Sequence, residues 1–279
     1  MDILNGHSLW WVAGLFLSLG LTGVIAGVLA GLLGVGGGIV IVPVLYNLFS
    51  LLGVDESVKM HVAVGTSLAT IVPTSFMSAR SHAAKGNLDK DLLKSLAWPL
   101  FGGVIVGSFL SGYFKGPVLS GIFGVVGLLV ALNMAFRAKS SALADQLPGA
   151  PWKQFIGAII GGFSTLMGIG GGTLSVPIFT AFNVPVHKAV GTAAAIGLVI
   201  SIPGALGFVL NGLHVEHRPP FTFGYVNLIG FALIVPMTMW MAPVGARLAS
   251  RTKPDRLKQA FAFFLFLTSI KMLYSLLTH

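Results

Sequence analysis

A glycine-rich stretch occurs twice in this chain, and its residue types suit contact with an anion. The first copy spans 33–43 and ends in Pro43, the second spans 167–177 and ends in Pro177, and each contains three successive glycines. Three glycines weaken a helix by about 1 kcal/mol each, and each proline removes one helical hydrogen bond. A helix that begins after such an interruption offers free backbone N–H groups and the positive end of its dipole, which attract an anion.

We expect the backbone of both copies to contact the substrate, because glycine leaves the amides open to close approach. The alternative is that the glycines serve only as a hinge or a kink. Pro43 and Pro177 are predicted to break the helices that follow the glycines. The predicted substrate contacts in these stretches are Gly36, Gly37, Gly38, Gly170, Gly171 and Gly172.

A second motif also occurs twice, and it carries hydroxyl groups. The run from His61 to Thr66 matches the run from His187 to Thr192, and both end in Ala-Val-Gly-Thr. Thr66, Ser67 and Thr192 are predicted to donate hydrogen bonds to substrate oxygens. The alternative for each hydroxyl is a bond back to a carbonyl of its own helix.

Three cationic or titratable residues stand near the ends of the segments that carry these motifs. His61 and His187 occupy matching places and are candidates for a gate or a proton-linked site, because imidazole titrates near neutral pH. The alternative is an interfacial or capping histidine. Arg80 is a candidate for attracting anions to the cytoplasmic mouth, and the alternative is a solvated charge that obeys the positive-inside rule.

The composition places these motifs in a membrane. Of the 279 residues, 55% are hydrophobic and 9% are charged, whereas a soluble domain has about 25% charged residues. Cysteine is absent, which excludes disulfides and thiol chemistry. The net charge of +9 fits basic cytoplasmic loops and is compatible with an anionic substrate. The first apolar run lacks a preceding basic region, so we expect it to be retained rather than cleaved.

Ten apolar segments can be marked, five in each half. A first repeat over 1–137 and a second over 153–279 are separated by a polar linker at 138–152. The segment that follows each triple glycine is shorter than the roughly 20 residues of a membrane span. The predicted segments are 9–33, 39–52, 62–79, 92–114 and 118–137, then 153–168, 173–183, 188–211, 224–246 and 258–277.

The two motifs recur in the same order, which indicates an internal duplication. Loops rich in Lys and Arg alternate along the chain, so the halves are predicted to be antiparallel with both termini outside. The predicted fold class is an all-α polytopic membrane protein with two inverted repeats and broken or short helices after each triple glycine. Glycines four residues apart, as at Gly23, Gly27 and Gly31, predict close helix packing. Interrupted segments at matching places in two halves point to the binding site of a transporter.

These motifs resemble the TauE/SafE family of sulfite and organosulfur-anion exporters. The resemblance rests on 31–43, on the second copy at 167–177, on the two Ala-Val-Gly-Thr motifs and on the short polar turn 86–89. It implies a multi-pass protein of the cell (inner) membrane that exports a small anion such as sulfite or a sulfonate. The second half departs from the first at Ala193, which replaces Ser67.

Other classes of function lack the residues that they need. No nucleophile with a base appears in the apolar segments, which argues against an enzyme, and neither glycine stretch has the GxGxxG spacing of a nucleotide site. The run His214-Val215-Glu216-His217 lacks a third distant ligand, so we expect no metal and no cofactor. All eight Asp and Glu residues lie outside the apolar segments, which predicts electrogenic export without obligatory sodium coupling.

Two alternatives to an exporter stay open on the sequence alone. One is an anion channel or a facilitator for another small anion, and the other is a non-transporting membrane assembly subunit. The expected partners are a small anionic substrate and membrane lipid, and no nucleic acid. A homo-oligomer is one of the assemblies that the sequence leaves open.

Overall fold

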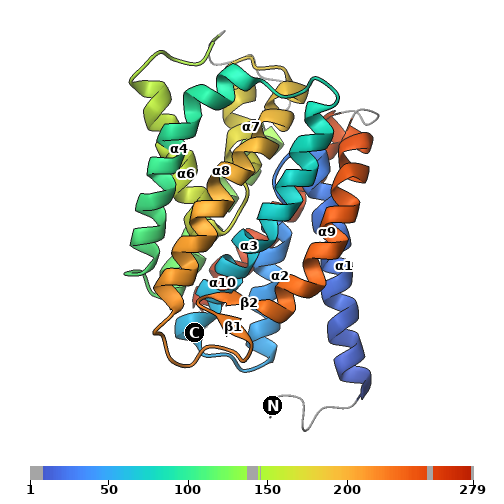
Figure 1. The fold of residues 1–279 in the computed structure, drawn as a ribbon, viewed down its shortest axis with the longest axis vertical. Helices are drawn as coiled ribbons and strands as arrows, with labels where there is room; N and C mark the ends of the chain where they lie inside the picture. Colours follow the sequence, from blue (N-terminus) through green and yellow to red (C-terminus); the bar gives the residue numbers. More distant parts are fainter. Residues whose placement is uncertain (1–8, 137–143, 145, 250–253, 278–279) are drawn as a thin grey trace.

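The computed structural model describes residues 9–136, 144, 146–249 and 254–277, which form a bundle of helices (Figure 1). Six of the described helices are long and apolar enough to cross a membrane, as predicted for a polytopic chain. The described helices are α1 (Leu9–Leu33), α2 (Gly38–Leu51), α3 (Glu56–Ala83), α4 (Lys90–Ser111), α5 (Gly116–Phe136), α6 (Trp152–Met167), α7 (Gly172–Ala181), α8 (Val186–Gly212), α9 (Leu228–Ala249) and α10 (Pro254–Leu277).

All ten predicted segments correspond to these helices, but a short β-hairpin was not predicted. The strands β1 (Thr222–Phe223) and β2 (Val226–Asn227) form an antiparallel hairpin between α8 and α9. The predicted apolar segment 224–246 begins inside this hairpin, whereas the helix α9 begins at Leu228. Strands of two residues are too short to show the alternation that marks a strand in sequence. Most of the predicted linker, at 138–143 and 145, lies outside the described residues.

The helices pack in pairs on either side of a central pair. In Figure 1, α1 and α9 lie on one side, α4 and α6 on the other, and α3 and α8 between them. The central helix α3 also packs on α9, and α8 packs on α4. α5 packs along α10. The two short helices α2 and α7 lie against α3 and α8 respectively, which places the starts of both inside the bundle.

Small residues allow the outer pairs to approach closely, as the four-residue glycine spacing predicts. A Cβ at Gly31 would overlap the carbonyl oxygen of Ala242 on α9. A Cβ at Gly161 on α6 would overlap the carbonyl oxygen of Leu100 on α4. Backbone-to-backbone contact of this kind supplies dispersion energy where the lipid removes the hydrophobic drive for association.

The outward helix faces carry large apolar side chains that a bilayer would solvate. Phe109 on α4 is 62% exposed, Leu129 on α5 is 61% exposed and Leu210 on α8 is 66% exposed. The inward face of α3 carries instead a series of buried hydroxyl residues, including Thr66, Ser67, Thr70, Thr74 and Ser75. The polar groups of the spans therefore face the bundle interior, where a pathway for a polar solute would lie.

Candidate functional site

The two glycine stretches meet at the centre of the bundle. A Cβ at Gly38 would overlap the carbonyl oxygen of Gly168, and a Cβ at Gly172 would overlap that of Gly34. Both helix starts are buried. Gly38 is the first residue of α2 and Gly172 is the first residue of α7, so the N-terminal ends of the two helices are the ends that meet. Two positive helix ends are thereby brought together.

No side chain caps either of these helix starts. Gly37 precedes α2 and Gly171 precedes α7, and neither has a side chain that could accept a bond from the first-turn N–H groups. The first N–H groups of a helix lack carbonyl partners in the preceding turn, although here the N–H of Val40 donates to the carbonyl oxygen of Gly37 at 3.0 Å. The six predicted contact glycines are all buried. The amides could therefore serve an anion, but only after the surrounding helices move.

The sequence predicts that the two prolines break the helices, but they do not. Pro43 lies inside α2 and Pro177 inside α7, and both helices continue past them. A proline this close to a helix start removes a single hydrogen bond, here to the carbonyl of Ile39 or Thr173. The interruption lies at the glycines themselves, between Leu33 and Gly38 and between Met167 and Gly172.

Thr66 and Thr192 each hold a loop that comes from the opposite half. Thr66 Oγ1 accepts a 2.8 Å hydrogen bond from the backbone N–H of Asn227. The residue before Thr66 is Gly65, where a Cβ would lie 2.5 Å from the carbonyl oxygen of Tyr225. We call this set of four residues the hairpin clasp, because Tyr225 lies in the turn of the β1–β2 hairpin and Asn227 lies in β2.

The second Ala-Val-Gly-Thr motif makes the matching contact at the other end of the central helices. Thr192 Oγ1 accepts a 3.0 Å bond from the backbone N–H of Asp89, and a Cβ at Gly191 would overlap the carbonyl oxygen of Asn87. We call these four residues the turn clasp. Neither threonine shows the bond to its own helix that was the alternative, and their donation to substrate stays a prediction.

Ser67 links the halves in a way that its counterpart cannot repeat. Its hydroxyl is fully buried and donates a 2.7 Å bond to the carbonyl oxygen of Gly168, in the second glycine stretch. The equivalent residue of the second half is Ala193, which has no hydroxyl. The site is therefore built asymmetrically at this position.

The two predicted gate histidines occupy different surroundings. His61 is buried, its Nε2 lies 3.2 Å from the carbonyl oxygen of Ser111 and 3.0 Å from that of Phe114, and its ring stacks on Tyr225 at 4.9 Å. It thus caps the end of α4, which was the alternative to a gate role. His187 and Arg80 are exposed, near the beginning of α8 and the end of α3 respectively.

Sequence reasoning missed several buried hydroxyls on α3, α7 and α8. Ser75, Ser201, Thr173 and Ser175 are almost completely buried, and their hydroxyls have no hydrogen-bond partner among the described residues. The missed signal was the spacing between halves, since Ser75 and Ser201 are 126 residues apart, as are Thr66 and Thr192. Unpaired buried hydroxyls are a place where a solute could bind.

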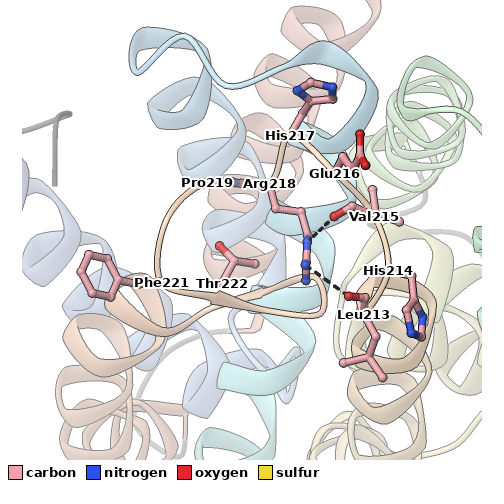
Figure 2. A pocket seen from close by; sticks show the side chains of 9 residues that line it. All are labelled: Leu213, His214, Val215, Glu216, His217, Arg218, Pro219, Phe221 and Thr222. Atoms are coloured by element: carbon pink, nitrogen blue, oxygen red, sulfur yellow. Dashed lines mark hydrogen bonds between the residues drawn. The ribbon is translucent and has the colours of Figure 1, made fainter.

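The loop with the histidine-rich run surrounds a separate, open pocket of about 500 Å³ (Figure 2). The Arg218 side chain lines this pocket and donates hydrogen bonds to the carbonyl oxygens of Val215 at 2.6 Å and Leu213 at 3.2 Å. His214 and His217 point to different sides of the loop (Figure 2). No three His, Cys, Asp or Glu side chains are arranged to hold a metal ion within the described part of the chain.

Comparison with known proteins adds to this geometry. The family model described as "Sulfite exporter TauE/SafE" matches residues 19–272. A probable membrane transporter protein of Haemophilus influenzae is 33% identical over 90% of this chain and 96% of its own length. Another from Methanocaldococcus jannaschii is 28% identical, with 85% and 88% covered, and YunE of Bacillus subtilis is 26% identical, with 93% and 97% covered. No solved structure matches the chain.

Proposed function

From the premise that the chain belongs to the TauE/SafE family of multi-pass membrane proteins, we propose that it exports a small sulfur-containing anion by alternating access. Sulfite and small sulfonates are the anions that we propose. The observation that carries the proposal is the meeting of two uncapped, glycine-rich helix starts at a buried point. The amides of Gly36–Gly38 and Gly170–Gly172 would hold the oxygens of the anion.

The packing of the helices supports the proposed inverted repeat. The pair α1–α9 corresponds to the pair α6–α4, and the contact of α3 with α9 corresponds to that of α8 with α4. The clasps support opposite directions for α3 and α8. The N-terminal turns of α3 meet the hairpin that follows α8, while the N-terminal turns of α8 meet the turn that follows α3. Inverted repeats of this kind place a transporter's site at the repeat interface.

The clasps supply two candidate gates for alternating access. All nine predicted substrate contacts are buried, so the centre is closed in this structure. The hairpin clasp and the turn clasp lie near opposite ends of α3 and α8. We propose that opening the hairpin clasp exposes the centre to the outside and that opening the turn clasp exposes it to the cytoplasm. The positive-inside rule gives this sidedness, because the turn clasp adjoins Lys85 and Lys90.

The driving force can come from the membrane potential. The chain carries no Asp, Glu, Lys or Arg between Met60 and Ala79 of α3, so the usual groups for ion coupling are missing there. One negative charge that leaves an inside-negative cell gains about 2.3 kcal/mol per 100 mV. Weak binding at the centre would then suffice, since the potential sets the direction.

The test uses purified protein in liposomes with a potassium–valinomycin potential. Flux of labelled sulfite should follow the sign of the potential, persist without sodium and saturate with concentration. Counterflow of labelled against unlabelled anion would separate a transporter from the channel alternative. Flux that ignores the potential and tracks a sodium gradient would contradict the proposed mechanism. Liposomes that contain the Gly172→Ala variant serve as the control for leakage.

A further inference from the structure

Ser75 of α3 places an unpaired hydroxyl beside the crossing of the glycine stretches. Its side chain is fully buried, and its Oγ has no partner among the described residues. A Cβ at Gly36 would lie 3.2 Å from this oxygen, and a Cβ at Gly197 of α8 would overlap it. The Ser75 hydroxyl therefore lies between the first glycine stretch and α8.

Neighbouring hydroxyls on α3 show what a buried helical hydroxyl ordinarily does. Thr70 donates to the carbonyl oxygen of Ser67 at 2.7 Å, and Thr74 donates to that of Thr70 at 2.7 Å. Such bonds to the preceding turn are the common solution for hydroxyls within helices. Ser75 makes no such bond, although it lies on the same helix. A buried hydroxyl left without a bond is destabilising, so the position favours a partner from outside the chain.

The second half supplies a matching residue. The only hydroxyl residues of α8 are Thr192 and Ser201, and each lies 126 residues after a hydroxyl residue of α3, namely Thr66 and Ser75. Both threonine oxygens are engaged in the clasps. The Ser201 hydroxyl is fully buried and has no partner in the described part of the chain. Ser201 follows Gly197 by one helical turn, which is about 6 Å along α8.

We infer that Ser75 and Ser201 are a pair of hydroxyl donors, one from each half, that hold the oxygens of the transported anion. The inference rests on the proposed function and adds two side chains to its backbone site. Hydroxyls and amides bind by directed hydrogen bonds, so the pair selects an oxyanion with acceptor oxygens on two sides. A spherical halide offers no such directions, which makes it the poorer substrate.

The test compares Ser75→Ala, Ser201→Ala and a matched control in the full-length protein. Ser120→Ala is the control, because the Ser120 hydroxyl on α5 is equally buried and equally without a partner in the described residues. The probes are labelled sulfite, methanesulfonate and chloride in liposomes, together with thermal unfolding in detergent. Each alanine at 75 or 201 should raise the KM for the oxyanions about tenfold and leave chloride flux unchanged. Ser75→Thr, which keeps a hydroxyl, should retain most of the affinity.

The outcomes separate the inference from the proposed function. Thermal stability should not fall in Ser75→Ala or Ser201→Ala, because neither loses a hydrogen bond within the protein. An unchanged KM in both variants, alongside saturable flux through the unmodified protein, would overturn the inference alone. A loss of stability equal to the loss of transport would overturn it too, since that result assigns the serines to packing. No flux of any probe through the unmodified protein would remove the proposed function and the inference together.

Discussion

The two glycine stretches share a sequence pattern but differ in backbone conformation. In the first, Gly36 and Gly37 have φ of 70° and 82°, the left-handed region that side-chain-bearing residues avoid. In the second, the glycine before α7, Gly171, has φ of −53°, which any residue adopts. The first stretch therefore needs glycine for its conformation at the two positions just before α2. The second stretch needs it for that reason at Gly168, whose φ is 65°, whereas Gly170 and Gly172 are needed because the backbone of Gly34 and Val35 lies so close. Glycines at equivalent positions of the two stretches can therefore be required for different physical reasons.

The largest effect that we expect is the loss of stability and transport when either of the two glycines that begin α2 and α7 is replaced. At these positions the two stretches should respond alike. Gly38→Ala and Gly172→Ala each place a Cβ against a backbone carbonyl of the opposite stretch. Overpacking against backbone should destabilise each variant by about 3 kcal/mol and abolish transport. Thermal unfolding and sulfite flux measure both effects. Gly20→Ala on α1, where nothing lies within 4 Å of a Cβ, is the control. Normal transport by either variant would place that glycine off the substrate path.

A second pair of variants should separate the stretches. Gly37→Ala forces a left-handed alanine and brings its Cβ to 2.9 Å from the carbonyl oxygen of Ala26, so we expect a loss of about 2 kcal/mol. Gly171→Ala adds no left-handed strain, but it brings its Cβ to 2.4 Å from Cγ2 of Ile196, a branched side chain with little freedom to shift. We therefore expect a smaller loss, of about 1 kcal/mol, from overpacking alone. The measurement is thermal unfolding in detergent.

The control for the conformational part of this difference is Gly86→Ala. Gly86 has φ of 70° and nothing within 4 Å of its Cβ position, so its replacement isolates the left-handed strain, about 1 kcal/mol. Equal losses for Gly37→Ala and Gly171→Ala would mean that the two stretches are physically equivalent after all.

Substitution of the two clasp threonines should have a smaller effect. The two variants should differ in the side of the membrane from which a buried thiol becomes easier to label. Thr66→Val and Thr192→Val each remove the acceptor of one loop N–H, which weakens that clasp by about 1–2 kcal/mol. Because the chain has no cysteine, Ser175→Cys provides a single buried thiol for an impermeant reagent. Thr66→Val should increase labelling from outside and Thr192→Val from inside.

The labelling experiment has a built-in control in Thr180→Val. The Thr180 hydroxyl bonds to its own helix, at Val176, and touches neither clasp, so labelling should stay at the level of Ser175→Cys alone. If both clasp variants increased labelling from the same side, the clasps would not be two separate gates.

The smallest predicted effect concerns the position where the halves differ in residue type. Ser67→Ala should lose about 1 kcal/mol of stability, because the carbonyl oxygen of Gly168 loses its bond from the hydroxyl. Ala193→Ser should lose less, because a serine within a helix can bond back to a carbonyl of its own helix. Thermal unfolding of both variants checks this pair, and a larger loss for Ala193→Ser would reverse the assigned asymmetry.

The sequence was sufficient to predict the helices but not what their motifs contact. Long apolar runs located all ten segments, although several helix ends differ from the predicted bounds, and glycines four residues apart predicted close helix packing. The clasps depend on contacts such as that between Thr66 and Asn227, which are 161 residues apart, and no local pattern indicates the partner. The prolines misled because one lost hydrogen bond is tolerable inside a packed helix. Ser75 and Ser201 could have been found by extending the 126-residue spacing along both segments.

The reciprocity of the clasps bears on how such a chain could have arisen. Thr66 in the first half is completed by Asn227 of the second, and Thr192 in the second half by Asp89 of the first. In a half-length ancestor, the threonine of the Ala-Val-Gly-Thr motif would lack the loop that it contacts, unless a second copy inserted beside it in the opposite orientation. On the proposed inverted repeat, such an ancestor would have needed to enter the membrane in both orientations, as a dual-topology homodimer, before its gene fused. Two separately expressed halves of the present chain should then still find each other in the bilayer.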